Sequence, residues 1–311
     1  MMQSVNNLIY AESKSFDPYF NLGFEKYLID SVRDDDIILY LWQNEKTVVI
    51  GRNQNVYDEC NLAELEKLGG KVARRMSGGG AVFHDIGNLN FTFIAKSDKY
   101  NVNDQMDIII DALKAFGISA EKNGRNDMTV DGKKFSGSAF TKHGTTECHH
   151  GTLMISVNSD ILDKVLNVSH EKLSKHNVNS VKSRTVNLSS LSPDITVDKL
   201  KNAIKLSFLK VYNASSFGSE INPFDIQLDE YTNYFSNENW IYGERIKFTD
   251  QLKYNHPLGE IKIELDIKAG KIINSRVYSD SLDLQFIDQI KDILPGMPYS
   301  EAKTRIEEML L

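Results

Sequence analysis

The sequence predicts an α+β protein: a large domain with a mixed or antiparallel sheet flanked by helices, then a small C-terminal α+β domain. Strand-like segments cluster between residues 36 and 95 and do not alternate regularly with helices, which favours this class. Asp131-Gly132, set between apolar flanks, is typical of a tight two-residue hairpin turn. A second alternating pattern surrounds "KAGK" at residues 268–271, and two helical segments follow it.

Length and composition limit the class of protein. A chain of 311 residues favours two domains, and we place them at residues 1–245 and 246–311, with the polar stretch 236–255 as the hinge. A hydrophobic content of 41% with 25% charged residues is typical of a globular protein. The net charge of -7 argues against nucleic acid as the main partner.

The expected location is the cytoplasm. The first residues lack the pattern of a secretory signal, and no apolar run approaches the roughly 20 residues of a membrane helix. Cys60 and Cys148 are the only cysteines, which fits a reducing compartment.

Periodicity predicts the elements of both domains. Apolar residues at helical spacing predict helices over 17–32, 61–70, 104–117, 196–213, 282–294 and 299–311. Asp17 and Pro18 fit a cap and first helical position, and Asn61 fits a second cap. Alternating or β-branched runs predict strands in 36–52 (two, around a turn at Asn44 and Glu45), 71–75, 81–85, 89–95, 127–140 (a hairpin), 151–157 and 259–280 (a hairpin).

The stretch "RRMSGGGAVFHD", residues 74–85, is the first candidate for chemistry. Arg75 offers a cationic fork suited to phosphate, and the glycines allow a ligand to approach backbone N–H groups. The common nucleotide loops are absent, because no G-x-x-x-x-G-K-[ST] occurs and Phe83 breaks a G-x-G-x-x-G pattern. Taken alone, the string is explained equally well by an exposed glycine-rich hairpin loop.

The second candidate is "GRNDMTVDGKKFSGSAF", residues 124–140. Lys134 precedes a run of small residues, 136–139, and such a loss of bulk inside a strand indicates close approach of a ligand or another backbone. Asn126 and Asp127 lie across the turn, where they could help hold Mg²⁺ on phosphates. An ordinary solvated lysine is the alternative.

The third candidate is "ECHHGTLMI", residues 147–155. His149 and His150 would point to opposite faces of a strand, so they are poor joint ligands for one metal. With no C-x-x-C pair, we predict no structural metal site. Cys148 beside a histidine could be a thiolate nucleophile, but strand alternation places it opposite His149.

Six segments in order resemble the lipoate-protein ligase A family, in the superfamily shared with biotin-protein ligases and octanoyltransferases. The resemblance covers essentially the whole chain and implies a large catalytic domain with a small C-terminal domain. The segments are "DPYFNLGFEKYL", "LYLWQNEKTVVIGRNQNVYDECN", "RRMSGGGAVFHDIGNLNFTF", "GRNDMTVDGKKFSGSAF", "HHGTLMI" and "SVKSRTVNL".

The resemblance also implies site residues. Lys134 corresponds to the catalytic lysine, while Met76 departs from the usual family pattern. The expected ATP-binding residues are Arg75, Gly80, Ala81, Val82, Phe83 and Lys134, and the expected lipoate-binding residues are Lys134, Ser77, His84, Gly137 and His150.

The implied reaction joins lipoate to ATP, with Mg²⁺, and gives lipoyl-AMP. At ~4 Å and an effective dielectric near 20, two approaching anions repel by about 4 kcal/mol, which Lys134 would offset. The lipoyl group would then pass to a lysine of lipoyl domains, in the E2 subunits of 2-oxoacid dehydrogenases and the H protein of glycine cleavage. Lys175, Lys182 and Arg184 could form a docking edge for an acidic lipoyl domain or simply a solvated loop.

Three other functions remain open. An octanoyltransferase would need a cysteine nucleophile, and "EKNGRND", residues 121–127, contains none where the related enzymes carry it. A lipoyl amidotransferase could keep the same motifs. A non-catalytic lipoyl-binding module is disfavoured by intact Arg75, Gly80 and Lys134.

Overall fold

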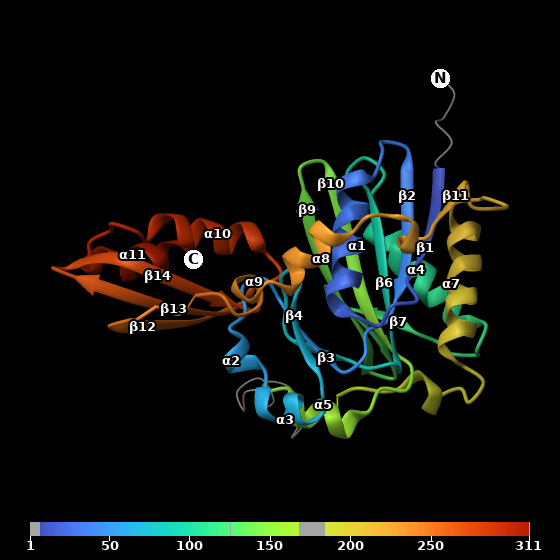
Figure 1. Cartoon of the computed structure of the whole chain (residues 1–311), viewed down its shortest axis with the longest axis horizontal. Helices are drawn as coiled ribbons and strands as arrows, with labels where there is room; N and C mark the ends of the chain where they lie inside the picture. Colours follow the sequence, from blue (N-terminus) through green and yellow to red (C-terminus); the bar gives the residue numbers. More distant parts are fainter. Residues whose placement is uncertain (1–6, 125, 168–183, 245, 311) are drawn as a thin grey trace.

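The computed structural model describes residues 7–124, 126–167, 184–244 and 246–310. A large mixed α+β domain lies beside a small one built from the C-terminal part of the chain (Figure 1). The predicted fold class is confirmed, including the small C-terminal α+β unit. Within these residues, no helix has the length and apolar character required to cross a membrane.

An eight-stranded mixed sheet forms the centre of the large domain. Its first three strands run parallel, and each later neighbour pair is antiparallel. In spatial order the strands are β11 (Ser219–Ile221), β1 (Asn7–Glu12), β2 (Asp36–Trp42), β6 (Asn88–Lys96), β10 (Thr146–Met154), β9 (Lys133–His143), β8 (Asp127–Val130) and β7 (Glu121–Asn123).

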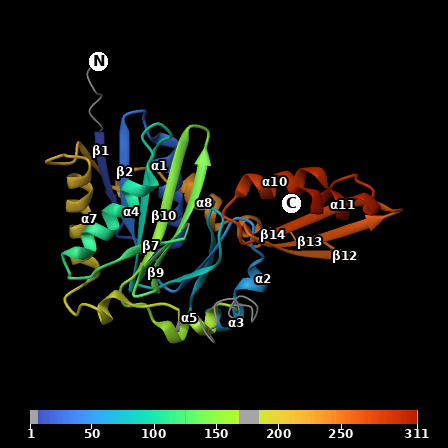
Figure 2. The ribbon, with the colours of Figure 1, turned by 180° about the vertical axis from the view of Figure 1, so that it is seen from behind.

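Helices cover both faces of this sheet, as the two opposite views show (Figures 1 and 2). Strand β2 is buried throughout, and its side chains alternate between two cores. Ile37, Leu39 and Leu41 join the core under α4 and α7, whereas Ile38, Tyr40 and Trp42 join the core under α1 and α8. The α-helices found in the described part of this domain are α1 (Pro18–Ser31), α2 (Val56–Glu59), α3 (Leu62–Lys67), α4 (Val102–Lys114), α5 (Ser159–Val165), α7 (Val197–Val211), α8 (Asp229–Ser236) and α9 (Glu238–Tyr242).

The local signals for helix starts and the tight turn are confirmed. The Asp17 side chain accepts hydrogen bonds from the backbone N–H groups of Tyr19 and Phe20 at the start of α1, satisfying donors that a helix leaves unpaired. Asp131 and Gly132 have φ values of 49° and 73°, as a tight hairpin turn of this kind requires, and they join β8 to β9.

A second, three-stranded sheet carries the glycine-rich loop. It has the order β4 (Lys71–Arg74), β3 (Thr47–Ile50) and β5 (Val82–His84), so the loop connects its two outer strands. Residues 36–52 do form the two predicted strands. However, β2 and β3 belong to different sheets, and the turn between them passes the chain from one sheet to the other.

The small domain contains one strand more than its sequence pattern indicated. Its sheet is β12 (Asp250–His256), β13 (Gly259–Lys268) and β14 (Lys271–Ser279), covered by α10 (Leu284–Ile293) and α11 (Tyr299–Met309). The hinge proposed at 236–255 is therefore wrong as a single linker, because α9 and most of β12 fall within it. The boundary at residue 245 stays a prediction.

The small domain rests directly on the glycine-rich loop. Gly79 N–H donates to the carbonyl of Ser281 at 3.0 Å, and Lys291 Nζ donates to Asn53 Oδ1 at 2.7 Å. A Cβ atom at Gly78 would lie 2.2 Å from the carbonyl oxygen of Ser281. The absence of a side chain at Gly78 is thus a condition for this contact.

Gly78→Ala is expected to separate the two domains partly, because the clash falls on backbone and costs about 1–3 kcal/mol. Small-angle scattering should show a larger radius of gyration. Gly80→Ala is the matched control, since a Cβ there meets nothing within 4 Å. Unchanged scattering from the Gly78 variant would contradict the contact.

Candidate active site

Arg75 determines the shape of the glycine-rich loop. Its guanidinium is buried, and Nη2 donates to the carbonyls of Gly78 at 2.7 Å and Gly80 at 2.8 Å. Nη1 donates to the carbonyl of Val49 at 3.2 Å. Burial lowers the pKa of Arg75 to about 10, so the group stays charged near neutral pH. With these carbonyls turned toward Arg75, the loop presents a fixed backbone surface.

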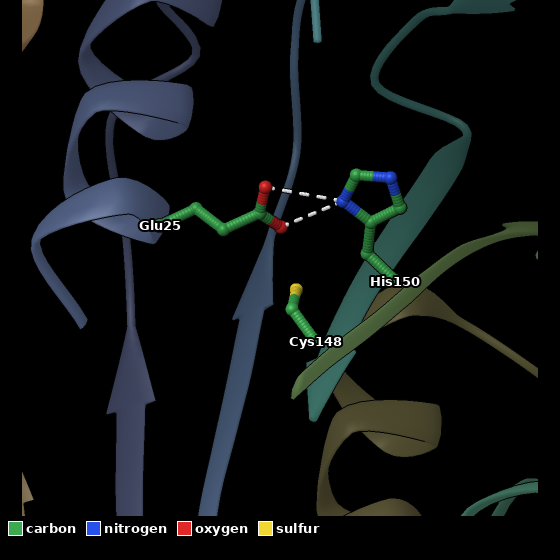
Figure 3. A group of neighbouring side chains, drawn as sticks. All are labelled: Glu25, Cys148 and His150. Carbon is green, nitrogen blue, oxygen red and sulfur yellow. Dashed lines mark hydrogen bonds and ion pairs between the residues drawn. The ribbon is translucent and has the colours of Figure 1, made fainter. Parts of the chain in front are cut away.

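A buried hydrogen-bond chain leads from Arg75 to helix α1. Arg75 Nε donates to Ser77 Oγ at 3.0 Å, and Ser77 Oγ contacts His150 Nε2 at 2.7 Å. Figure 3 shows the last link, in which His150 Nδ1 contacts the Glu25 carboxylate at 2.9 Å. Because a carboxylate only accepts, His150 Nδ1 carries the hydrogen, and Ser77 can donate to Nε2.

The order hydroxyl, imidazole, carboxylate is that of a serine hydrolase, yet Ser77 is placed differently. Its exposure is 0%, and it does not line the adjacent cavity, whereas His150 does. Its oxygen also accepts the hydrogen bond from Arg75. Ser77 therefore joins Arg75 to His150, and its hydroxyl does not line the adjacent cavity.

Cys148 lies next to the same carboxylate and imidazole (Figure 3). Ligand atoms of Glu25, Cys148 and His150 lie within 4.8 Å of one another, so a metal is sterically conceivable. However, Glu25 and His150 already bond to each other, and burial raises the pKa of the Cys148 thiol well above its usual value, which opposes the thiolate that a metal needs. The absence of a structural metal stays a prediction.

Two adjoining cavities lie beside the hydrogen-bond chain that runs from Arg75 to Glu25. The Trp42 cavity, about 150 Å³, has Leu22, Trp42 and Val49 in its wall. The Phe83 cavity, about 350 Å³, has Phe83 and Arg184 in its wall. Six residues line both: Gly80, Ala81, Val82, Lys134, Gly137 and Thr152.

Lys134 is held where the cavities meet. Its Nζ lies 2.7 Å from Asp127 Oδ1. A Cβ at Gly137 would lie 2.9 Å from the same Nζ, so the lysine side chain crosses the space that Gly137 leaves free. The backbone of Lys134 is fixed as well, because its N–H donates to Arg184 O and its carbonyl accepts from Val186 N–H, both at 2.9 Å.

The structure brings the residues expected from the sequence together around these cavities, although it does not test their roles. Ser77 and Asp127 stand behind the wall and contact His150 and Lys134. Lys175 and Lys182 lie outside the described residues. Among the others, Gly80, Ala81, Val82, Lys134 and Gly137 line both cavities, Arg75, His84, Asn126 and His150 line the Trp42 cavity, and Phe83 and Arg184 line the Phe83 cavity.

Glu25 was missed by the sequence reasoning. It is only 5% exposed and bonds both His150 and Thr92. Its position between Leu22 and Leu28 places a carboxylate on the apolar stripe of a helix. A charged residue on such a stripe indicates a buried partner. This pattern in the sequence could have identified Glu25.

Comparison with known families identifies the two domains. The model of the lipoyl protein ligase A/B catalytic domain matches residues 17–209. The model of the bacterial lipoate protein ligase C-terminus matches residues 245–310.

Two curated relatives named lipoate-protein ligase A match over almost the whole chain. The protein of Psychrobacter cryohalolentis is 36% identical over 94% of this chain and 89% of its own length. The protein of Blochmanniella floridana is 35% identical over 93% of this chain and 88% of its own length.

Solved structures agree on the fold. P. falciparum LipL1, solved in complex with lipoate, is 31% identical with a TM-score of 0.83, covering 97% of this chain and 93% of LipL1. A bipartite lipoate protein ligase of Thermoplasma acidophilum, solved together with its E2 lipoyl domain, has a TM-score of 0.66 at 24% identity, covering 80% of this chain and 100% of that one. A lipoate-protein ligase A bound with ATP has a TM-score of 0.63 at 23% identity, and the match covers 76% of this chain and 98% of that one. The chain thus belongs to the lipoyl protein ligase A/B family and carries both its catalytic domain and the C-terminal domain of the bacterial lipoate protein ligases.

Proposed function

We propose that this protein is an ATP-dependent lipoate-protein ligase, which converts free lipoate to lipoyl-AMP and transfers the lipoyl group to a lysine of a lipoyl domain. The position of Lys134 carries the proposal. A single ammonium group lines two adjoining cavities, so it can contact an acid in one and a phosphate in the other. The names of the relatives support the same reaction.

The Trp42 cavity is the proposed site of the acyl chain. Leu22, Trp42, Val49 and Val82 line it and provide the apolar surface that an eight-carbon chain requires. Lys134 stands where this cavity joins the second one, so the carboxylate end would face the lysine. The solved lipoate complex of LipL1 supports lipoate as the acid.

The Phe83 cavity is the proposed site of ATP. The glycine-rich loop lies along it, and Arg184 adds a cation. Arg75 is proposed to act by shaping the loop, because its guanidinium nitrogens already bond to Ser77, Val49, Gly78 and Gly80. The ATP-bound relative of the same fold supports this assignment.

Asn126 and Asp127 are proposed to support Mg²⁺ on the phosphates. An amide oxygen and a carboxylate are hard ligands of the kind this ion accepts, beside phosphate oxygens and water. The ion would neutralise phosphate charge.

The chemistry assigned to the chain is mainly electrostatic. A lipoate oxygen attacks the α-phosphorus, and pyrophosphate leaves. Lys134 is proposed to shift from Asp127 to bridge the carboxylate and the phosphate, offsetting a repulsion of about 4 kcal/mol. In the second step the acceptor lysine amine attacks the acyl carbon, and AMP leaves.

The proposed acceptors are the lipoyl domains of E2 subunits and the H protein. The Thermoplasma ligase solved with its E2 lipoyl domain supports the first of these. Asp280 of the small domain lines the Phe83 cavity, where the domain can shield the mixed anhydride from water. We also propose a cytoplasmic location, since both cysteines are free.

A cysteine-dependent acyltransferase is disfavoured by the position of both thiols. Cys60 and Cys148 are 2% and 1% exposed, and neither lines the Trp42 or Phe83 cavity. Burial also raises the pKa of Cys60 to about 11. Neither sulfur is therefore in a position to form an acyl-enzyme.

Lipoate-dependent exchange of labelled pyrophosphate into ATP tests the proposal. The wild-type protein should catalyse exchange, and Lys134→Ala should reduce it by about 10²–10³-fold. Lys133→Ala, the exposed neighbour on β9, and Cys148→Ser should retain it.

If well-folded protein shows no exchange but moves a lipoyl group from one carrier protein to another, the ligase proposal is wrong. An amidotransferase then takes its place. Binding of lipoate without either reaction would indicate a non-catalytic module.

Gly137→Ala tests how finely the lysine is placed. The new methyl group would displace Nζ, from which it is 2.9 Å away, and such shifts reduce kcat by about tenfold or more. Thermal unfolding should change little, because the displaced atom ends a flexible side chain. Wild-type exchange rates in this variant would refute the positioning role of Gly137.

A further inference from the structure

One residue in the wall of the Trp42 cavity has a ring nitrogen without a partner among the described residues. His84 is 3% exposed and lines this cavity, and its Nε2 makes no hydrogen bond to any described residue. Buried polar atoms are nearly always paired with protein, water or a ligand, so an unpaired atom in a residue of the cavity wall is a contact that a bound ligand can make.

The neighbours of His84 determine which ring nitrogen carries the hydrogen. Asn21 Nδ2 donates to the backbone carbonyls of Ser15 at 2.9 Å and Gln43 at 2.8 Å, which fixes the orientation of this amide. Because this nitrogen is only a donor, the Asn44 atom that lies 3.0 Å from it is the amide oxygen, which shares one of the two N–H groups with a backbone carbonyl. Asn44 must therefore present its Nδ2 to His84 Nδ1, 3.2 Å away, and that nitrogen accepts.

A second amide points to the same tautomer. Asn90 Oδ1 accepts from Asn88 Nδ2 at 2.8 Å, which leaves Asn90 Nδ2 facing His84 Nδ1 at 3.5 Å. Two donors thus surround Nδ1. Burial lowers the pKa of His84 to about 3, so the ring is neutral and its one hydrogen sits on Nε2.

We propose that His84 Nε2–H is a specificity-determining donor that recognises a sulfur of the dithiolane ring, with Asn21 and Asn44 as positioning residues that fix its tautomer. This inference rests on the proposed function. His84 lines the Trp42 cavity but not the Phe83 cavity, whereas Lys134 lines both. With the carboxylate at Lys134, the acyl chain extends into the Trp42 cavity, whose wall includes His84.

The donor distinguishes acids by their distal atoms. A ring sulfur of lipoate is a weak acceptor, while the methyl end of octanoate offers none and leaves Nε2–H unpaired. Ser138 lines the same cavity, and its Oγ also makes no hydrogen bond within the described part of the chain. This hydroxyl can rotate to donate or accept, so it imposes no such choice.

The test compares lipoate with octanoate in His84→Phe, which keeps an aromatic ring beside Trp42 but removes the donor. The ratio of kcat/KM for lipoate over octanoate should fall about threefold to tenfold, the range of one hydrogen bond. An unchanged ratio would overturn the inference.

His149→Phe is the matched control and should keep the wild-type ratio. His149 is also buried, its pKa is lowered to about 3 and its Nε2 is unpaired, but it faces Gln105 on α4 and does not line the cavity. If the ratio falls equally in both variants, the loss of any buried histidine lowers it, and the specific role of His84 is contradicted.

Nitrogen-15 NMR of histidine-labelled protein gives a readout independent of His84→Phe. The His84 ring should show a hydrogen on Nε2 that shifts on adding lipoate but not octanoate. Asn44→Leu should mix the two tautomers. A hydrogen on Nδ1 in the wild-type protein would contradict the positioning role.

Calorimetric binding of both acids without ATP separates this inference from the proposed ligase activity. A preference for lipoate that is lost in His84→Phe upholds the inference even if pyrophosphate exchange fails. Exchange with equal binding of the two acids in wild type and variant overturns the inference and leaves the ligase proposal intact.

Discussion

The ammonium group of Lys134 has to lie where two cavities join, and much of the large domain contributes to holding it there. Asp127 on the preceding strand pairs with it, and Gly137 leaves the space that its side chain crosses. The backbone segment 184–186 fixes it from the other side. A cation in this position can hold two anions at bonding distance, which water at high dielectric cannot do as well.

The chain from Arg75 to Glu25 has a related but separate role. A buried arginine and a buried glutamate are each costly to desolvate, and here Ser77 and His150 link them through hydrogen bonds. The link runs from the glycine-rich loop, beneath one cavity, to helix α1. It ties the loop that lines the Phe83 cavity to helix α1, which contributes Leu22 to the wall of the Trp42 cavity, so the two cavities keep a fixed relation.

Local sequence predicted those parts of the fold that depend on local physics. Asp131-Gly132 could be read as a tight turn because few other dipeptides adopt its φ values, and the cap at Asp17 follows from donors at a helix start. The separation of β2 from β3 and the strand β12 were not predictable in this way. Strand pairing depends on partners far along the chain, and the alternation in 250–256 was too polar to recognise.

The site residues likewise fall into those that local sequence could identify and those that it could not. Arg75, Gly80 and Lys134 stand in contiguous motifs, so the sequence predicted them as members of one site, and all three line the Trp42 cavity. Glu25 and Asn44 act through partners 125 and 40 residues away, and no spacing rule connects such pairs. Their contacts form only when the fold brings helix α1 to strand β10 and the turn after β2 to strand β5.

The most direct measurement is a crystal structure with a non-hydrolysable analogue of lipoyl-AMP bound. Our account predicts that Lys134 Nζ leaves Asp127 and lies within hydrogen-bond distance of both the acyl oxygen and a phosphate oxygen, with the acyl chain in the Trp42 cavity and the nucleotide in the Phe83 cavity. An analogue seated in both cavities while Nζ points into solvent would contradict it.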